Sequence, residues 1–184
     1  MLEWLNNIDV RLFLFLNGIH SEFWDPVMVF TSGRLSWIPL YAFILYLIIK
    51  KYKKKSWIIV LSIIVLITLS DQISVHFFKN IFERLRPCKN PEFKEIIHVV
   101  NDRCGGNYGF VSSHAANTFA LAIFTLLLLN SRLYSIAIIS WATLVSYSRI
   151  YLGRHYPGDV IGGALLGILI GYIVYYIYKL VKKE

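Results

Sequence analysis

The stretch SWIIVLSIIVLITLSDQISVHFF, residues 56–78, decides the fold class of this chain. It is apolar over nearly its whole length, and about 20 helical residues are enough to cross the hydrocarbon core of a bilayer. A helix that is apolar on every side has no face to offer to water. The stretch therefore predicts a helix that crosses a membrane.

Further apolar stretches on both sides extend this pattern to five predicted spans. The other four run over residues 35–49, 113–129, 133–152 and 159–181. Residues 7–19 have helical spacing of apolar positions but are too few to cross, so they predict a helix at the membrane interface. We expect an all-α polytopic membrane bundle of five to six helices. Residues 1–34 form its N-terminal interfacial segment and residues 35–184 its membrane domain.

Composition and charge support a protein whose environment is the lipid bilayer. The chain is 57% hydrophobic, whereas a soluble domain is about half apolar. The formal charge is +8, but the basic residues gather at residues 50–55, at Arg132 and at residues 179–183, beside apolar stretches. The positive-inside rule and anionic lipid headgroups explain these runs, so no nucleic-acid partner is expected. The protein is expected in the cytoplasmic membrane as a multi-pass protein.

With the basic runs in the cytoplasm, the loop 79–112 and the turn 154–158 face outward. The first 20 residues lack the basic region and cleavage site of a signal peptide, so the first span is expected to direct insertion. Loop 79–112 keeps a surplus of basic residues on the outer side, which an anionic ligand would explain. Its cysteines, Cys88 and Cys104, are either joined, as an oxidising compartment allows, or free. No metal-ligand spacing is present, so neither a metal nor a cofactor is expected.

Two segments place polar groups at the outer ends of the predicted spans. In KNIFERLRP, residues 79–87, Lys79 and Arg86 share one face if the helix of the second span continues as far as Pro87. In GFVSSH, residues 109–114, serine precedes an apolar run. This predicts a helix N-cap whose free N–H groups and dipole attract an anion, with His114 in the first turn. Taken alone, the first segment also fits Lys and Arg side chains that snorkel at a helix end, and the second fits a capped helix with a hydrogen-bonded histidine.

The third segment, SRIYLGRHYPGD at residues 148–159, is the most specific of the three. Proline is favoured at the first helical position, so the last span is expected to begin near Pro157. His155 then precedes a helix N-terminus and Asp159 lies in its first turn. A carboxylate one turn from a histidine can fix the ring tautomer and leave the other nitrogen free to attack. Together the three segments supply a nucleophile, an acid and several cations, which phosphoryl transfer requires.

At these residues the sequence resembles the type 2 phosphatidic acid phosphatase superfamily. The signature of that family is Lys-x6-Arg-Pro, then Pro-Ser-Gly-His, then Ser-Arg-x5-His-x3-Asp. The first and third parts are complete here, whereas the second reads VSSH at residues 111–114. The missing proline and glycine alter the stiffness of this loop rather than its reacting groups. The resemblance implies a six-helix bundle, with the N-terminal helix as the sixth element.

The resemblance also implies a chemistry and a set of site residues. His155 attacks phosphorus to form a phosphohistidine without a metal, Asp159 holds its ring, and His114 protonates the leaving oxygen. The phosphate is bound by Lys79, Arg86, Ser112, Ser113 and Arg149. The predicted function is hydrolysis of a membrane lipid phosphate or pyrophosphate. The candidates are undecaprenyl pyrophosphate, phosphatidylglycerol phosphate, phosphatidic acid and lipid A phosphates.

Two other functions stay open on the sequence alone. A lipid phosphotransferase would pass the phosphate to an acceptor other than water. A non-catalytic transporter or lipid-binding protein would use Asp71 and Gln72, because ionisable groups inside a membrane often mark a pathway. We interpret Asp71 instead as hydrogen-bonded to a neighbouring helix. Arg11 and Arg34 fit either a headgroup pocket or the membrane interface.

Overall fold

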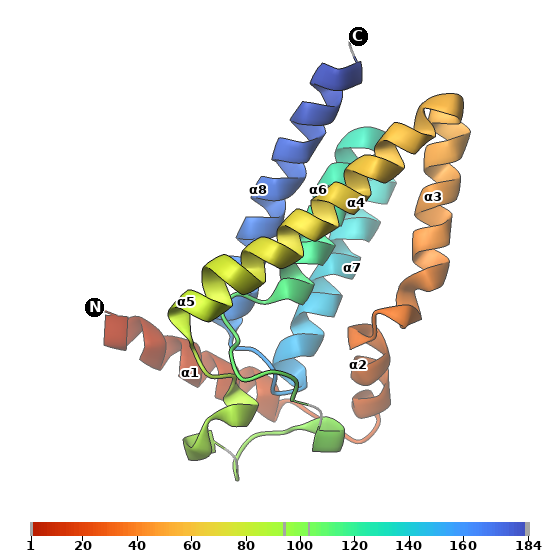
Figure 1. Ribbon diagram of the computed structural model, residues 1–184. Coiled ribbons are helices and arrows are strands. Elements are labelled where there is room, and N and C mark those ends of the chain that lie inside the picture. The colour runs from red at the N-terminus through yellow and green to blue at the C-terminus, as the bar shows by residue number, and fades with distance from the viewer. Residues whose placement is uncertain (1, 94, 103, 183–184) are drawn as a thin grey trace.

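The computed structural model describes residues 2–93, 95–102 and 104–182, which are mostly helical and contain no β-strand. Lys94, Arg103 and Lys183, which add to the basic loops and runs, lie outside the described residues. The helices that run side by side (Figure 1) are α3 (Ile38–Tyr52), α4 (Ser56–Gln72), α6 (Ser113–Leu129), α7 (Arg132–Tyr151) and α8 (Pro157–Lys182). Each corresponds to one predicted span, which confirms the predicted all-α helix bundle.

The outer surface of this bundle is apolar. Along α8, every fourth residue from Leu165 to Ile177 is a large apolar side chain that is exposed. Such a continuous stripe is unfavourable in water and is typical of a helix that faces lipid. The helical stretches Leu35–Phe82 and Pro157–Lys182 are long and apolar enough to cross a membrane. The first folds back at Lys53–Lys55 and so contains both α3 and α4.

Close packing of α8 on α6 forms the centre of the bundle. Gly163, Gly167 and Gly171 of α8 all face α6. A Cβ atom on Gly171 would lie 2.9 Å from the carbonyl oxygen of Ala120, and one on Gly167 would collide with the carbonyl of Ala116. Small residues at this spacing let the backbones of membrane helices approach closely. The contact holds the N-terminal ends of α6 and α8 next to each other.

The three basic connections lie at one end of the bundle, where the α3–α4 turn, the α6–α7 turn and the end of α8 meet (Figure 1). There Lys51 donates to the carbonyl oxygens of Leu128 and Leu129 at 2.9 and 2.8 Å. These bonds satisfy carbonyls at the negative end of α6. The loops with the signature residues lie at the opposite end. The expected separation of a basic end from a polar site end is therefore present.

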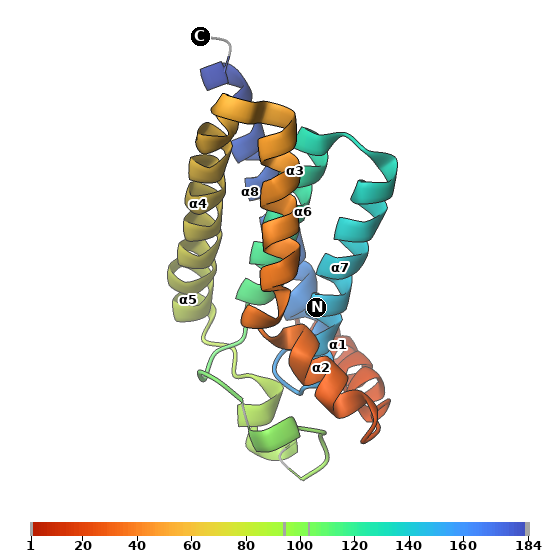
Figure 2. The same cartoon turned by 90° about the vertical axis from the view of Figure 1, so that its right-hand side faces the viewer.

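Two helices of the N-terminal segment lie at the site end: α1 (Leu2–Gly18) and α2 (Trp24–Ser32) (Figures 1 and 2). The first is longer than the predicted pattern at residues 7–19, and the second was not predicted. Phe13 of α1 is fully buried and packs edge-on against Tyr156 at 5.3 Å between ring centroids. Asn17 donates to the carbonyl of Tyr151 at 2.8 Å. The N-terminal helix is thus packed on the bundle as its sixth element, across its end.

The second span does not continue as a helix to Arg86, so the condition under which Lys79 and Arg86 would share one face is not met. After α4 the chain forms a π-helical segment (Ile73–Lys79) and the short helix α5 (Asn80–Phe82). It leaves the helix at Glu83, where φ is 45°. The N–H of Arg86 then donates to the carbonyl of Asn107 at 3.0 Å, and that of Gly109 to the carbonyl of Arg84 at 2.8 Å. Because these bonds to a distant segment replace helical ones, Lys79 and Arg86 do not share a helix face.

Candidate active site

The turn between α7 and α8 holds the predicted nucleophile. The chain turns away from α7 at Gly153, where φ is +68°. The next helix, α8, begins at Pro157 as predicted. His155 lies between them, and its backbone N–H donates to the carbonyl of Arg149 at 3.2 Å. The side chain of His155 is only 2% exposed. The ring is therefore surrounded by protein groups that can set its charge and orientation.

The carboxylate of Asp159 lies beside this ring, as the sequence predicted. The distance from Oδ2 to Nδ1 of His155 is 3.4 Å, which is longer than a typical N–H···O hydrogen bond. The same oxygen accepts the backbone N–H of Tyr156 at 3.0 Å, and Oδ1 accepts from Arg84 at 2.9 Å. A Cβ atom on Gly109 would lie 2.8 Å from Oδ2. Glycine is thus required where the loop passes the pair, and Asp159 has more partners than the sequence indicated.

The N-terminus of α6 contributes less backbone to an anion site than predicted. Ser112 is the N-cap, and its side chain accepts from the N–H of Ala115. Its own N–H already donates to the carbonyl of Asp159 at 2.9 Å, so it is not available to a phosphate. The hydroxyl of Ser113 accepts from Lys79 Nζ at 2.6 Å. The N–H groups of Ser113 and His114 remain as first-turn donors that no intrahelical carbonyl accepts.

The three predicted cations converge on His155. Arg149 is 4% exposed, donates to the hydroxyl of Ser32, and has a buried Nε without a hydrogen-bond partner among the described residues. Arg86 is buried too, and its guanidinium donates to two backbone carbonyls of the loop before α6. Burial lowers the pKa of His155 well below its ordinary value, and the charges of Arg149, Arg86 and Lys79 lower it further. The ring is therefore neutral at physiological pH, as a nucleophile must be.

A disulfide holds the loop that carries Arg86. Cys88 and Cys104 are joined, with their Cα atoms 5.9 Å apart, so of the two alternatives the bonded one is present. The carbonyl of Cys104 accepts from Arg86, and the N–H of Cys88 donates to the carbonyl of Gly153 at 3.1 Å. Closing a loop of this length stabilises a fold by about 3 kcal/mol. The bond thus ties the cation-bearing loop to the turn that holds the nucleophile.

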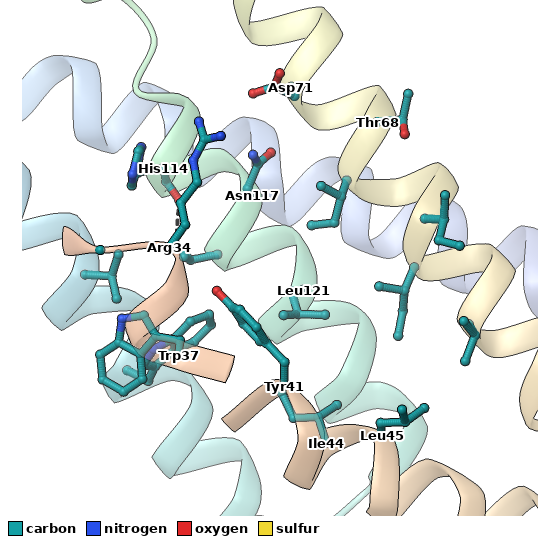
Figure 3. Close-up of a pocket in the computed structure, with 18 of the residues that line it drawn as sticks. Arg34, Trp37, Tyr41, Ile44, Leu45, Thr68, Asp71, His114, Asn117 and Leu121 are labelled. Atoms are coloured by element: carbon teal, nitrogen blue, oxygen red, sulfur yellow. Dashed lines mark hydrogen bonds between the residues drawn. The ribbon is translucent and has the colours of Figure 1, made fainter. Parts of the chain in front are cut away.

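An apolar cavity of about 640 Å³ opens beside the site, between α3, α4, α6 and α7 (Figure 3). His114 lines its polar end together with Arg34, Asn117 and Asp71. Most of the remaining wall consists of apolar side chains from the four helices. A space of this size and polarity suits a hydrocarbon chain whose polar head lies at His114.

Several residues at this end were missed or misread from the sequence. Asp71 lines the cavity with Gln72, and its carboxylate makes no hydrogen bond to a neighbouring helix in the described part of the chain, so the interpretation of Asp71 as bonded to another helix was wrong. Arg34 belongs to the cavity wall, whereas Arg11 is exposed on α1. The hydrogen bond between Ser32 and Arg149 and the ion pairs of Arg84 could not be predicted from the sequence pattern. They join segments far apart in the chain.

The chain is similar over its whole length to bacterial proteins named lipid A 4'-phosphatase. The chain is 46% identical over 187 residues to the lipid A 4'-phosphatase of Bacteroides thetaiotaomicron, covering 100% of this chain and 83% of that protein. It is 35% identical over 184 residues to the lipid A 4'-phosphatase of Porphyromonas gingivalis, covering 100% and 78%. The crystal structure of a transmembrane PAP2-type phosphatidylglycerolphosphate phosphatase from Bacillus subtilis shares the fold. Its TM-score is 0.74 at 21% identity, over 96% of this chain and 87% of that chain.

The match to a family model covers most of the chain and includes all three signature segments. Residues 57–183 match the model described as PAP2 superfamily. This is the family that the signature indicated, and its members named above are phosphatases of membrane lipids. The chain belongs to the PAP2 superfamily and is a membrane lipid phosphatase of that type.

Proposed function

We propose that His155 is the nucleophile of this phosphatase. Its Nε2 attacks phosphorus, a bond from nitrogen to phosphorus forms, and the bond from phosphorus to the lipid oxygen breaks. His114 gives a proton to that oxygen, so the lipid leaves as an alcohol. Water then attacks the phosphohistidine, gives a proton to His114 and releases inorganic phosphate. The burial of His155 beside the carboxylate of Asp159, within reach of the charges of three basic residues, is the observation that carries this assignment.

The proposed phosphate site is formed by Lys79, Arg86 and Arg149, with the backbone N–H groups of Ser113 and His114. Fixed cations and helix N-termini stabilise the charge that develops on the equatorial oxygens during phosphoryl transfer. The unpartnered Nε of Arg149 supports this placement, because a buried donor without an acceptor is costly unless a ligand supplies one. We expect hydrolysis without a metal, because these cations neutralise the negative phosphate charge that Mg²⁺ neutralises in other phosphoryl-transfer enzymes.

The substrate that we propose is a lipid A phosphate, removed at the 4' position. The whole-chain relatives at 46% and 35% identity both carry the name lipid A 4'-phosphatase. The apolar cavity next to His114 gives room for part of an acyl chain while the phosphate lies among the cations. The other predicted lipids are the comparison substrates.

The site end is proposed to face the non-cytoplasmic side. The disulfide Cys88–Cys104 lies at that end, and disulfides persist in oxidising compartments. The lysine-rich end then faces the cytoplasm, as the positive-inside rule requires. Residues 1–34 are proposed to lie at the outer interface, because α1 exposes Trp4, Leu12 and Phe15 beside its buried face.

The function is tested by phosphate release from detergent-purified protein with four lipids: lipid A, undecaprenyl pyrophosphate, phosphatidylglycerol phosphate and phosphatidic acid. We expect the highest kcat/KM with lipid A, loss of its 4'-phosphate by mass spectrometry, and unchanged rates in a metal chelator. A higher kcat/KM with another lipid would replace the proposed substrate. Release that depends on an added acceptor alcohol, with transfer of phosphate to it, would indicate a phosphotransferase.

The lowered pKa of His155 predicts where activity falls on the acid side. A histidine must be neutral to attack, and the ordinary pKa is 6.5. Because burial and cations lower the pKa, we expect the acid limb of kcat/KM below pH 6.5. In Arg86→Met one cation is gone, the pKa of His155 rises, and the limb moves to higher pH. A wild-type limb above pH 6.5, or a limb that moves down in Arg86→Met, would contradict this assignment.

A further inference from the structure

A chain of charged groups links the N-terminal helix to the reacting pair. Nη1 of Arg84 donates to Oδ1 of Asp159 at 2.9 Å, and Nη2 lies 2.8 Å from Oδ2 of Asp9. Asp9 is on α1, and its Oδ1 accepts the N–H of Gly158 at 2.7 Å, in the first turn of α8. Arg84 therefore lies between two carboxylates, one from α1 and one from α8.

Arg84 is held by more than these two ion pairs. Its guanidinium carbon lies 4.1 Å from the ring centroid of Tyr156, which is a cation–π contact. Nη2 also donates to the side-chain oxygen of Asn6 at 3.1 Å, and the backbone carbonyl accepts the N–H of Gly109 at 2.8 Å. The backbone of Arg84 is held by Gly109, the face of its guanidinium by Tyr156, and its two terminal nitrogens by the acidic and amide side chains. These contacts together fix the orientation of the planar group.

The orientation of Arg84 determines which carboxylate oxygen of Asp159 faces the His155 ring. The side chain of Asp159 is 0% exposed, so water does not replace a partner that is removed. Oδ1 is directed to Arg84, which leaves Oδ2 on the side of the His155 ring. Without Arg84 the buried carboxylate would lose its closest cation and the contact that fixes its rotation. Burying a carboxylate without a paired cation is costly, so the group would rotate or take up a proton.

We propose that Arg84 and Asp9 are positioning residues for the phosphatase reaction: Asp9 fixes Arg84, and Arg84 turns the carboxylate of Asp159 toward His155. This role rests on the nucleophilic role proposed for His155. This role gives the N-terminal helix a part in the active site, because α1 supplies Asp9, the carboxylate that pairs with Arg84 on the side away from Asp159. The charge of Arg84 is directed to two carboxylates, whereas the charges of Lys79, Arg86 and Arg149 act on the His155 ring.

The first test is Arg84→Gln in the full-length protein. A misplaced orienting group slows a reaction by about 100-fold without changing the substrate contacts. We expect kcat for phosphate release to fall by about that factor while KM changes by less than about threefold. Arg84→Lys should recover part of the loss, because an ammonium can pair with one carboxylate but cannot bridge both. Lys89→Gln, an exposed cation of the same loop, is the matched control and should behave as wild type.

The second test is whether Asp9 acts through Arg84. Asp9→Asn keeps an acceptor for the N–H of Gly158 but removes the charge, and we expect kcat to fall by about 10-fold. The double variant with Arg84→Gln should be no slower than Arg84→Gln alone, because residues that act through one contact are not additive. Glu3→Gln, an exposed acid on the same helix, is the control.

Two results would overturn the positioning role, provided that thermal unfolding in detergent shows folded variants. One is a raised KM with unchanged kcat in Arg84→Gln, which would make Arg84 a substrate-binding residue. The other is multiplied losses in the double variant, which would separate Asp9 from Arg84. Failure of the proposed nucleophile is distinguishable, because it would appear as retained turnover in His155→Ala whatever the Arg84 variants do.

Discussion

His155→Ala is expected to lower kcat for lipid phosphate hydrolysis by on the order of 10⁵-fold, because loss of a nucleophile removes the covalent route and leaves only binding and charge stabilisation. The expected phosphohistidine also disappears. The measurement is single-turnover hydrolysis of a ³²P-labelled lipid, quenched in alkali because phosphoramidate bonds break in acid. Label on the wild-type protein and none on the variant is the expected result.

His76→Ala is the matched control, since His76 is an exposed histidine of the π-helical segment near Lys79. It should hydrolyse the lipid at the wild-type rate. Turnover by His155→Ala within about tenfold of wild type would end the nucleophilic assignment. A large loss without any labelled wild-type protein under rapid quench would instead make His155 a base that activates water.

Arg149→Met is expected to lower kcat/KM by about 10³-fold or more, since a fixed guanidinium at a transferring phosphoryl group contributes an effect of that order. Methionine fills much of the same space without the charge. Inorganic phosphate, as product inhibitor, should bind more weakly to the variant. Steady-state kinetics on the preferred lipid and inhibition by phosphate measure both effects.

Thermal unfolding separates this catalytic role from a structural one. Arg149 is buried near other cations, so removing its charge relieves repulsion, and we expect Tm in detergent to stay or rise. Arg132→Met, an exposed arginine at the basic end, is the control with wild-type kinetics. A Tm that falls in parallel with activity would show that Arg149 holds the fold rather than the phosphate.

The helices and the reacting groups could be predicted because their signals are local. The apolar runs gave the five bundle helices, Ser112 and Pro157 marked the starts of α6 and α8, and both starts were confirmed. The signature pointed to the family that the comparison confirmed. The roles of the signature residues stay predictions, to be decided by the variants above.

The misread contacts lie where a distant segment decides the conformation. The helix does not reach Arg86, because bonds to Asn107 and from Gly109 replace its helical bonds. The N–H of Ser112 is taken by a carbonyl of α8, and Asp71 faces a cavity instead of a helix. None of these partners can be found from spacing along the chain.

By itself the sequence determined the membrane environment, the five bundle helices, the family and the set of chemical groups, since apolar length, caps and motif spacing act within a few turns of chain. Only the tertiary structure decided how those groups are oriented. It joined Cys88 to Cys104, placed an apolar cavity beside His114, and set Arg84 between Asp9 and Asp159. The physical reason is that charge pairing and burial depend on distances in space. These distances become short only when α1, loop 79–112 and α8 pack together.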